Sequence, residues 1–424
     1  MKWIVLGTAV LMYALVILFP ARKSWAAMGA ALCMVIIGAV GPLQAITKLI
    51  DWNILLIFVG SLIIAELFIY SRVPAVIADT IMVHSPNAGI AIVAILVMTG
   101  IISAFVENVA TVLVMAPIAL AFCKKIKLNP RMFMAGLAVM ANLQGTATLV
   151  GDPPSMIFAN YAHYGFNDFF VYQGKLSIFF AVQIGMIAGA IFFYFSFARA
   201  GKGKVDVERE KAQTMVPTVL LLLMIFGLAA ASFIFGGLTI ASGLWVMALG
   251  VFGFFWYWLI RREGWAKTFD MAKKLDWDTS LFLVGIFVVV GAVSHAGLLD
   301  DLAALLSMIV GNNVFLGFFL ILIVSVIISG FVDNVPYIIV MLPVAASLAA
   351  QLSLKPELYM FALLIGSCLG GNLTPFGASA NVVAIGILRQ QGEQMGFGRW
   401  LKIGVPFTLI TTCAAAAFVW LVWA

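Results

Sequence analysis

Apolar runs of about 20 residues recur along the chain, each long enough to cross a hydrocarbon core of roughly 30 Å as a helix. Hydrophobic residues make up 64% of the 424 residues and charged residues only 10%. That is too little charge to cover the surface of a soluble domain of this size. The sequence therefore predicts an all-α polytopic membrane protein. The first run, 3–19, lacks a cleavage site of small residues and is predicted to be a retained span.

Two stretches place an acid, an asparagine and a valine inside apolar sequence: SAFVENVATVLVMAP (103–117) and SGFVDNVPYIIVMLP (329–343). Three further pairs match in the same order at nearly the same spacing: IDWNILLIFVG (50–60) with LDWDTSLFLVG (275–285), KLNPRMFMAGL (127–137) with SLKPELYMFAL (353–363), and GTATLVGDPPS (145–155) with GNLTPFGASAN (371–381). Chance does not produce four such matches in one order. The chain is predicted to hold two homologous repeats, 1–199 and 215–424, joined by a cytoplasmic linker, 200–214.

Each repeat is expected to hold five spans and one re-entrant hairpin, and an odd number of crossings inverts the second repeat. The hairpins are 88–124, facing the cytoplasm, and 312–350, facing the periplasm. With the amino terminus outside, every basic residue except Lys2, Lys48, Lys175 and Lys355 falls in an inside loop, as the positive-inside rule requires. The expected spans are 3–19, 25–43, 52–70, 131–162 and 170–198, then 216–235, 238–260, 277–297, 356–388 and 402–423.

The two hairpin tips should meet near the bilayer midplane, beside breaks in the spans 131–162 and 356–388. Irregular backbone at that depth is tolerated where it lines a cavity, which is the usual layout of a transporter's binding site. The candidate substrate or ion ligands are Glu107, Asn108, Asn142, Gly145, Thr146, Thr148, Asp152, Asp333, Asn334, Gly371, Asn372, Thr374, Ser379 and Asn381.

Three of these residues are acids, which are costly in a membrane and are typical of ion or proton handling. Glu107, Asp152 and Asp333 are therefore the predicted proton-coupling residues. In the alternative interpretation, each acid only accepts hydrogen bonds from free backbone amides at a helix break. Neither tip and neither break contains lysine or arginine. A site of this charge favours a cation or a neutral hydroxylated solute over a dianion.

At these motifs, and at NLQGTATLVGDPPSMI (142–157) and GGNLTPFGASANVV (370–383), the chain resembles the ion transporter superfamily, specifically its ArsB/NhaD permease grouping. That grouping includes arsenite efflux permeases, sodium/proton antiporters and P-protein relatives. The resemblance implies ten spans with two opposed hairpins, a scaffold part and a moving part, elevator-type transport and a homodimer. Dicarboxylate carriers of the superfamily have Ser-Asn-Thr tips, so the acid–Asn–Val tips here argue against citrate or succinate.

These features predict a proton-coupled antiporter, not an enzyme, that exports arsenite or antimonite across the bacterial inner membrane. No GxxxxGK[ST] motif occurs, so a proton or sodium gradient is expected to drive it, without a cofactor or bound metal. The alternatives are a sodium/proton antiporter, a passive anion channel, and the membrane subunit of a pump with a separate ATPase subunit. The expected partners are a small inorganic solute and membrane lipid. The positive net charge reports orientation and does not indicate nucleic-acid binding.

Overall fold

The computed structural model describes residues 1–19, 22–198, 210–262 and 264–424, which are mostly helical. Most of the expected linker 200–214 therefore lies outside the described residues. In chain order the first repeat forms α1 (Lys2–Leu18), α2 (Lys23–Ile36), α3 (Pro42–Gln44) with a π-helical turn (Ala45–Leu49), α4 (Trp52–Tyr70), α5 (Val73–His84), α6 (Ala88–Ser103), α7 (Asn108–Ile126), α8 (Arg131–Gly145), α9 (Pro153–Tyr161), a 3-10 turn (Asn167–Phe169), β1 (Val171–Tyr172), β2 (Lys175–Leu176) and α10 (Ile178–Phe197).

The second repeat forms a corresponding series of helices, without the strands and the 3-10 turn. It comprises α11 (Val216–Phe235), α12 (Ile240–Phe255) with a π-helical turn (Trp256–Ile260), α13 (Trp265–Lys274), α14 (Trp277–His295), α15 (Leu298–Val310), α16 (Val314–Ser329), α17 (Asn334–Gln351), α18 (Glu357–Gly370), α19 (Ser379–Gln390) and α20 (Phe397–Trp423). Among the described residues, eight helices are long and apolar enough to cross a membrane: α4, α7, α10, α11, α12 with its π-helical turn, α14, α17 and α20.

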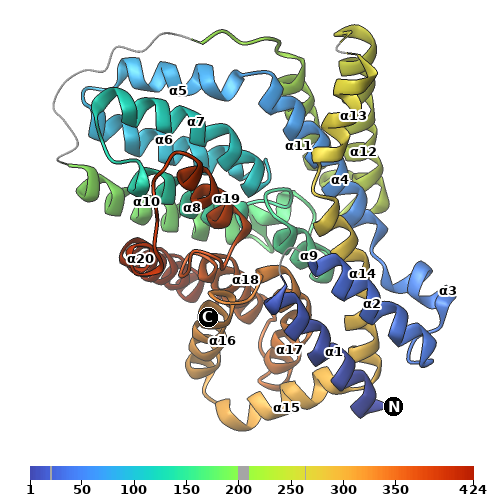
Figure 1. The fold of residues 1–424 in the computed structure, drawn as a ribbon. Coiled ribbons are helices and arrows are strands. Elements are labelled where there is room, and N and C mark those ends of the chain that lie inside the picture. Colours follow the sequence, from blue (N-terminus) through green and yellow to red (C-terminus); the bar gives the residue numbers. More distant parts are fainter. Residues whose placement is uncertain (20–21, 199–209, 263) are drawn as a thin grey trace.

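The second repeat is inverted relative to the first. Helix α5, which follows α4, runs along the top of Figure 1, whereas α15, which follows α14, runs along the bottom. Helix α4 packs against α12, and α14, the counterpart of α4, packs against α2, the counterpart of α12. A two-fold axis in the membrane plane produces this reciprocal pairing. The predicted all-α fold of two inverted repeats, each with a hairpin and a broken helix, is confirmed.

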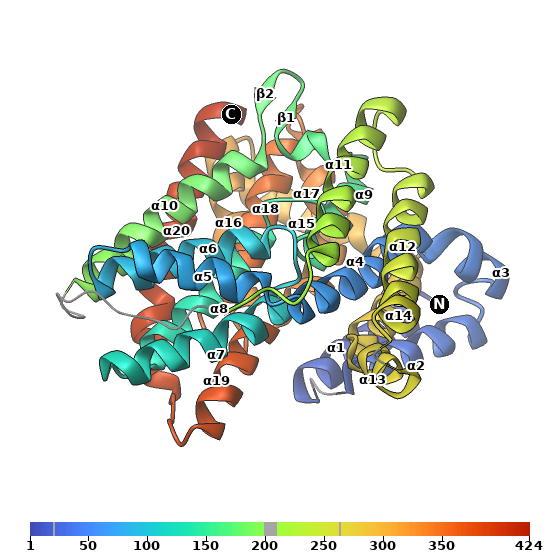
Figure 2. The same ribbon diagram turned by 90° about the horizontal axis from the view of Figure 1, so that it is seen from above.

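The helices form two groups that lie side by side in Figures 1 and 2. We call α1–α4 with α11–α14 the flanking group, and α6–α10 with α16–α20 the hairpin group. Within the hairpin group, α17 contacts α9 and α19 contacts α7. The tip of each hairpin therefore lies beside the break of the other repeat, and the two groups meet at that place.

Side-chain caps explain where the hairpin arms begin. Asn87 Oδ1 accepts a hydrogen bond from the amide of Ile90 at the start of α6, and Asn313 Oδ1 does the same for Leu316 at the start of α16. Asparagine is among the best residues at this position because its oxygen satisfies an amide that has no partner in the helix. The second arm of each hairpin is capped by an acid, as described below.

Two expected spans are shorter than predicted. In the stretch 170–198, the chain first forms the β1–β2 hairpin, in which Val171 pairs with Leu176, and α10 begins at Ile178. In the stretch 25–43, α2 ends at Ile36, and Gly38 follows with a φ of +74° that a helix does not allow. The apolar character continues beyond the helix in both places, so hydropathy overestimated the helix length.

Candidate functional site

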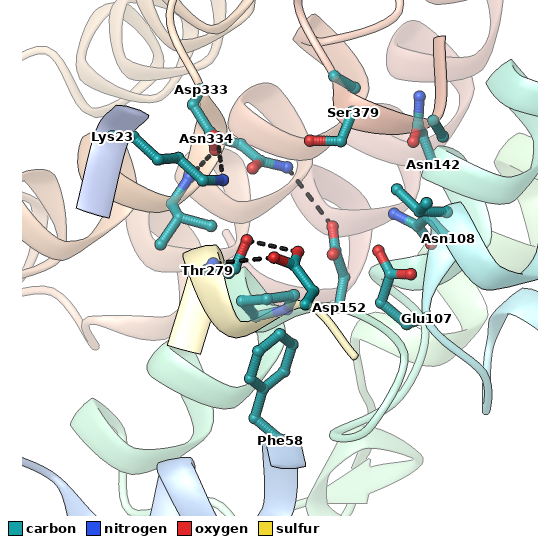
Figure 3. A pocket seen from close by; sticks show the side chains of 16 residues that line it. Lys23, Phe58, Glu107, Asn108, Asn142, Asp152, Thr279, Asp333, Asn334 and Ser379 are labelled. Carbon is teal, nitrogen blue, oxygen red and sulfur yellow. Dashed lines mark hydrogen bonds and ion pairs between the residues drawn. The ribbon is translucent and has the colours of Figure 1, made fainter. Parts of the chain in front are cut away.

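A pocket with an empty volume of about 430 Å³ lies where the two groups meet and where both hairpin tips meet both helix breaks (Figure 3). Seven of the fourteen predicted ligands line it: Glu107, Asn108, Asn142, Asp152, Asp333, Asn334 and Ser379. The other seven lie outside its lining: Gly145, Thr146, Thr148, Gly371, Asn372, Thr374 and Asn381. Inversion of the repeats thus brings side chains from distant parts of the chain to one small space.

The acids at the two hairpin tips cap the helices that follow them. Glu107 Oε2 accepts a hydrogen bond of 2.9 Å from the amide of Ala110, and Asp333 Oδ1 accepts one of 3.1 Å from Val335. Each carboxylate also faces the pocket (Figure 3). Capping and ligand binding are therefore compatible at both tips, because a carboxylate has a second oxygen to offer.

Asp152 stands immediately before α9 and does not cap it. Its Oδ2 instead lies 3.5 Å from Asn334 Nδ2, at the tip of the other repeat's hairpin. Two prolines follow Asp152 and fix the start of α9 without offering amide donors. Asp152 is only 8% exposed, so it connects the first break to the second tip inside the protein.

Glycines allow each break to fold back on itself. A Cβ added at Gly151 would lie 2.5 Å from the carbonyl oxygen of Gly145, and a Cβ at Gly377 would lie 2.6 Å from that of Gly371. Any larger residue at Gly151 or Gly377 would push the end of the break away from its beginning. The paired glycines seen in the sequence therefore shape the pocket wall without being exposed to a ligand themselves.

A threonine in each break holds the hairpin tip of its own repeat. The Thr148 hydroxyl donates to the carbonyl of Ala104, and the Thr374 hydroxyl donates to the carbonyl of Gly330. Both threonines are buried. These predicted ligands are thus engaged in tethering the tips.

We expect Thr148→Val to destabilise the protein, because it leaves the Ala104 carbonyl buried without a donor, at a cost of about 1–3 kcal/mol. The measurement is the melting temperature in detergent. Thr47→Val is the matched control, since the Thr47 hydroxyl donates 2.8 Å to the Leu43 carbonyl in an exposed place. Equal melting temperatures for the two variants would contradict the tether.

Three buried asparagines join the two breaks. Asn142 Nδ2 donates to Asn372 Oδ1 at 2.8 Å and to Asn381 Oδ1 at 2.9 Å. Asn381 Nδ2 in turn donates to the carbonyl of Gly371 at 2.9 Å. Asn372 and Asn381 are fully buried, so their amides link the repeats, and only Asn142 also reaches the pocket.

The sequence analysis missed four residues that line the pocket from the flanking group: Lys23, Phe58, Asp276 and Thr279. Asp276 caps α14, with Oδ1 2.9 Å from the amide of Thr279 and Oδ2 2.6 Å from its hydroxyl. The sequence analysis used the Asp276-Trp277 pair as evidence of the repeat but did not predict that Asp276 lines the site. The charge pattern had assigned Lys23 to an inside loop. Lys23 lies in none of the four repeated segments, so the repeat did not point to it.

Lys23 corrects the expectation of a site without basic residues. Its Nζ lies 3.2 Å from Asp333 Oδ2, and its side chain is only 11% exposed. The pocket therefore holds four carboxyl groups, from Glu107, Asp152, Asp276 and Asp333, and one ammonium group. Acidic groups still dominate it.

Comparisons with known proteins agree with this architecture. Residues 13–366 match the model of a family described as citrate transporters, CitMHS. An uncharacterized transporter of Mycobacterium tuberculosis is 32% identical over 378 residues, covering 88% of this chain and 86% of the relative. The 46 kDa membrane protein of Mycobacterium leprae is 28% identical with the same coverage. The human P protein is 23% identical, covering 96% of this chain and 58% of its own length.

Among solved structures, the YdaH transporter of Alcanivorax borkumensis, described as having an unusual topology, has a TM-score of 0.57 at 15% identity. The match covers 92% of this chain and 87% of that one. This likeness supports the fold alone. The family match covers most of the chain, and both the family and the Mycobacterium tuberculosis relative are named as transporters. The P protein bears out the predicted resemblance. The chain therefore belongs to the citrate transporter family within the ion transporter grouping, and it is a multi-pass secondary transporter.

Proposed function

We propose that this transporter is a proton-coupled antiporter of the bacterial inner membrane that exports undissociated arsenite or antimonite. The observation that carries the proposal is the excess of carboxyl groups over the single ammonium group in the pocket. In a site of low effective dielectric, this excess repels a free anion and tolerates a neutral solute. The amides of Asn108, Asn142 and Asn334 and the hydroxyl of Ser379 offer hydrogen bonds to a small hydroxylated solute.

Proton coupling follows from the same groups. A buried carboxyl group favours its neutral form unless it is paired, so it takes up a proton when no other partner neutralises it. Glu107, Asp152 and Asp333 face one pocket and approach it from both repeats. A proton and a cargo molecule that compete for this cluster would be exchanged across the membrane. Sodium could take the place of the solute in the same scheme.

A second candidate cargo is citrate accompanied by a divalent cation. It is favoured by the family description and by Lys23, which could pair with a carboxylate of the cargo. Citrate alone would meet the carboxylates of the pocket. A bound Mg²⁺ would offset that repulsion, since Mg²⁺ prefers oxygen ligands and binds through one or two carboxylates. The sequence had argued against citrate both because the tips lack the Ser-Asn-Thr triplet and because the site is acidic. Binding of citrate as its Mg²⁺ complex answers the second of these arguments.

Transport in proteoliposomes distinguishes these cargoes. Arsenite, sodium, citrate and citrate with Mg²⁺ are tested separately, each with and without an imposed pH gradient. We expect arsenite flux to rise with the gradient and to fall to the level of protein-free liposomes when the gradient is dissipated. Flux of citrate only when Mg²⁺ is present would replace the proposal by the second candidate. Flux of a free anion that ignores the pH gradient would indicate a passive channel.

A further inference from the structure

Lys23 connects the two helix groups through an ion pair. It lies at the start of α2 in the flanking group, and its Nζ is 3.2 Å from Asp333 at the tip of the hairpin α16–α17 (Figure 3). The pair is largely enclosed, with side-chain exposures of 11% for Lys23 and 26% for Asp333. An enclosed pair is costly to break by removing one partner, because the remaining charge is left without compensation.

Lys23 also has acidic neighbours on its own side. Asp276 lines the same pocket, and the hydroxyl of Ser24, the next residue, donates to Asp278. The ring of Phe282 on α14 lies 5.5 Å from the Lys23 ammonium and adds a cation–π contact. If Asp333 became neutral, the ammonium group would still have negative partners on α14. The hairpin tip, in contrast, would lose its only described ion pair.

The Lys23–Asp333 ion pair lies between the central pocket and a second cavity. A second cavity, with an empty volume of about 840 Å³, shares Lys23, Asp333 and Ser379 with the central pocket and extends past Phe331 and Phe376. These two phenylalanines are 54% and 55% exposed. A proton or solute that enters from this cavity therefore meets the Lys23–Asp333 pair at the edge of the pocket.

We propose that Lys23 is a positioning residue that holds the hairpin tip of the cargo-free transporter and releases it when a proton or cation neutralises Asp333. The ammonium then pairs with Asp276 and Asp278, and the tip is free to move against the flanking group. This deepens the proposed function and rests on its coupling scheme. It explains how an empty antiporter avoids returning without a coupling ion.

Charged groups from both helix groups face Lys23. They are Asp333 from the hairpin group and Asp276 and Asp278 from α14, with Glu107 and Asp152 across the pocket. Removing the ammonium removes the ion pair that holds the tip. The tip should then be released at every pH.

The test measures movement of the tip without any cargo. In a background without native cysteines, the labelling rate of Phe331→Cys is measured at a series of pH values. Each rate is divided by the rate for Gln391→Cys, an exposed site in a turn. The ratio cancels the effect of pH on the ionisation of the thiol. We expect the ratio to change with pH in the Lys23 protein and to stay at its low-pH value at every pH in Lys23→Met, because no ion pair is left to hold the tip. Lys23→Arg should keep the pH dependence of the Lys23 protein.

Asp333→Asn is the second variant, and it should abolish the pH dependence of the ratio. The inference is overturned if the ratio does not change with pH in the Lys23 protein, or if Lys23→Met or Asp333→Asn keeps the pH dependence. Because arsenite, sodium and citrate are absent, the result is independent of the cargo. A transporter that fails to carry arsenite would refute the proposed function and leave this measurement decisive for Lys23.

Discussion

Glu107→Gln and Asp333→Asn are each expected to reduce coupled transport to the level of protein-free liposomes while the protein still folds. The substitutions remove a negative charge but keep a side-chain oxygen. Asparagine caps a helix about as well as aspartate, so the bond to the Val335 amide can persist in Asp333→Asn. The loss should therefore follow from the missing charge. The measurement is solute flux driven by a pH gradient, with the melting temperature recorded for each variant.

Asp51→Asn is the matched control. Asp51 caps α4 as Asp333 caps α17, with Oδ1 2.9 Å from the amide of Ile54, but it does not line the pocket. It should lose no more stability than Asp333→Asn and should keep its transport. Full transport in both tip variants would show that Glu107 and Asp333 act only as caps. Equal loss in Asp51→Asn would show that the effect reflects damaged folding.

The sequence predicted the architecture well because the bilayer simplifies the problem. Long apolar runs report spans directly, and a repeat with an odd number of spans implies inversion. From inversion alone, Glu107 and Asp333 were expected at facing tips, and the structure places both at one pocket. Length was harder to predict. α5 and α15, at 12 and 13 residues, are too short to cross, and hydropathy does not separate such helices from loops.

Side-chain roles were less predictable than positions. Polar residues in an apolar break can either face a ligand or satisfy the freed backbone, and the sequence is the same in both cases. Thr148, Asn372 and Asn381 belong to the second kind, since their polar atoms are hydrogen-bonded to backbone carbonyls or to the Asn142 amide. Lys23 was missed for a different reason. Its contact with Asp333 joins the start of the first repeat to the second, and no repeat pattern reports such a pairing.

The two repeats differ in how much of the tip and break they expose, although their sequences align. Phe331 and Phe376 are 54% and 55% exposed beside the second cavity, whereas their counterparts are less exposed: Phe105 is partly buried against the core and Val150 is 1% exposed. An inverted repeat in which only one half is open gives access from one side of the membrane. The opposite state would follow if the halves exchanged their conformations.

A cysteine at Phe331 or Phe376 should therefore react with a bulky maleimide faster than one at the partly buried Phe105, and at least roughly tenfold faster than one at the buried Val150, which must wait for a less stable open state. Phe376 stacks on Phe397 at 5.8 Å, close to Arg399, which the charge pattern assigns to the cytoplasm. An impermeant maleimide should thus reach Phe376→Cys in inside-out vesicles and not in right-side-out vesicles. Labelling from the outside would reverse the predicted orientation. Equal rates at all four positions would mean that the asymmetry of the two halves does not govern access to the pocket.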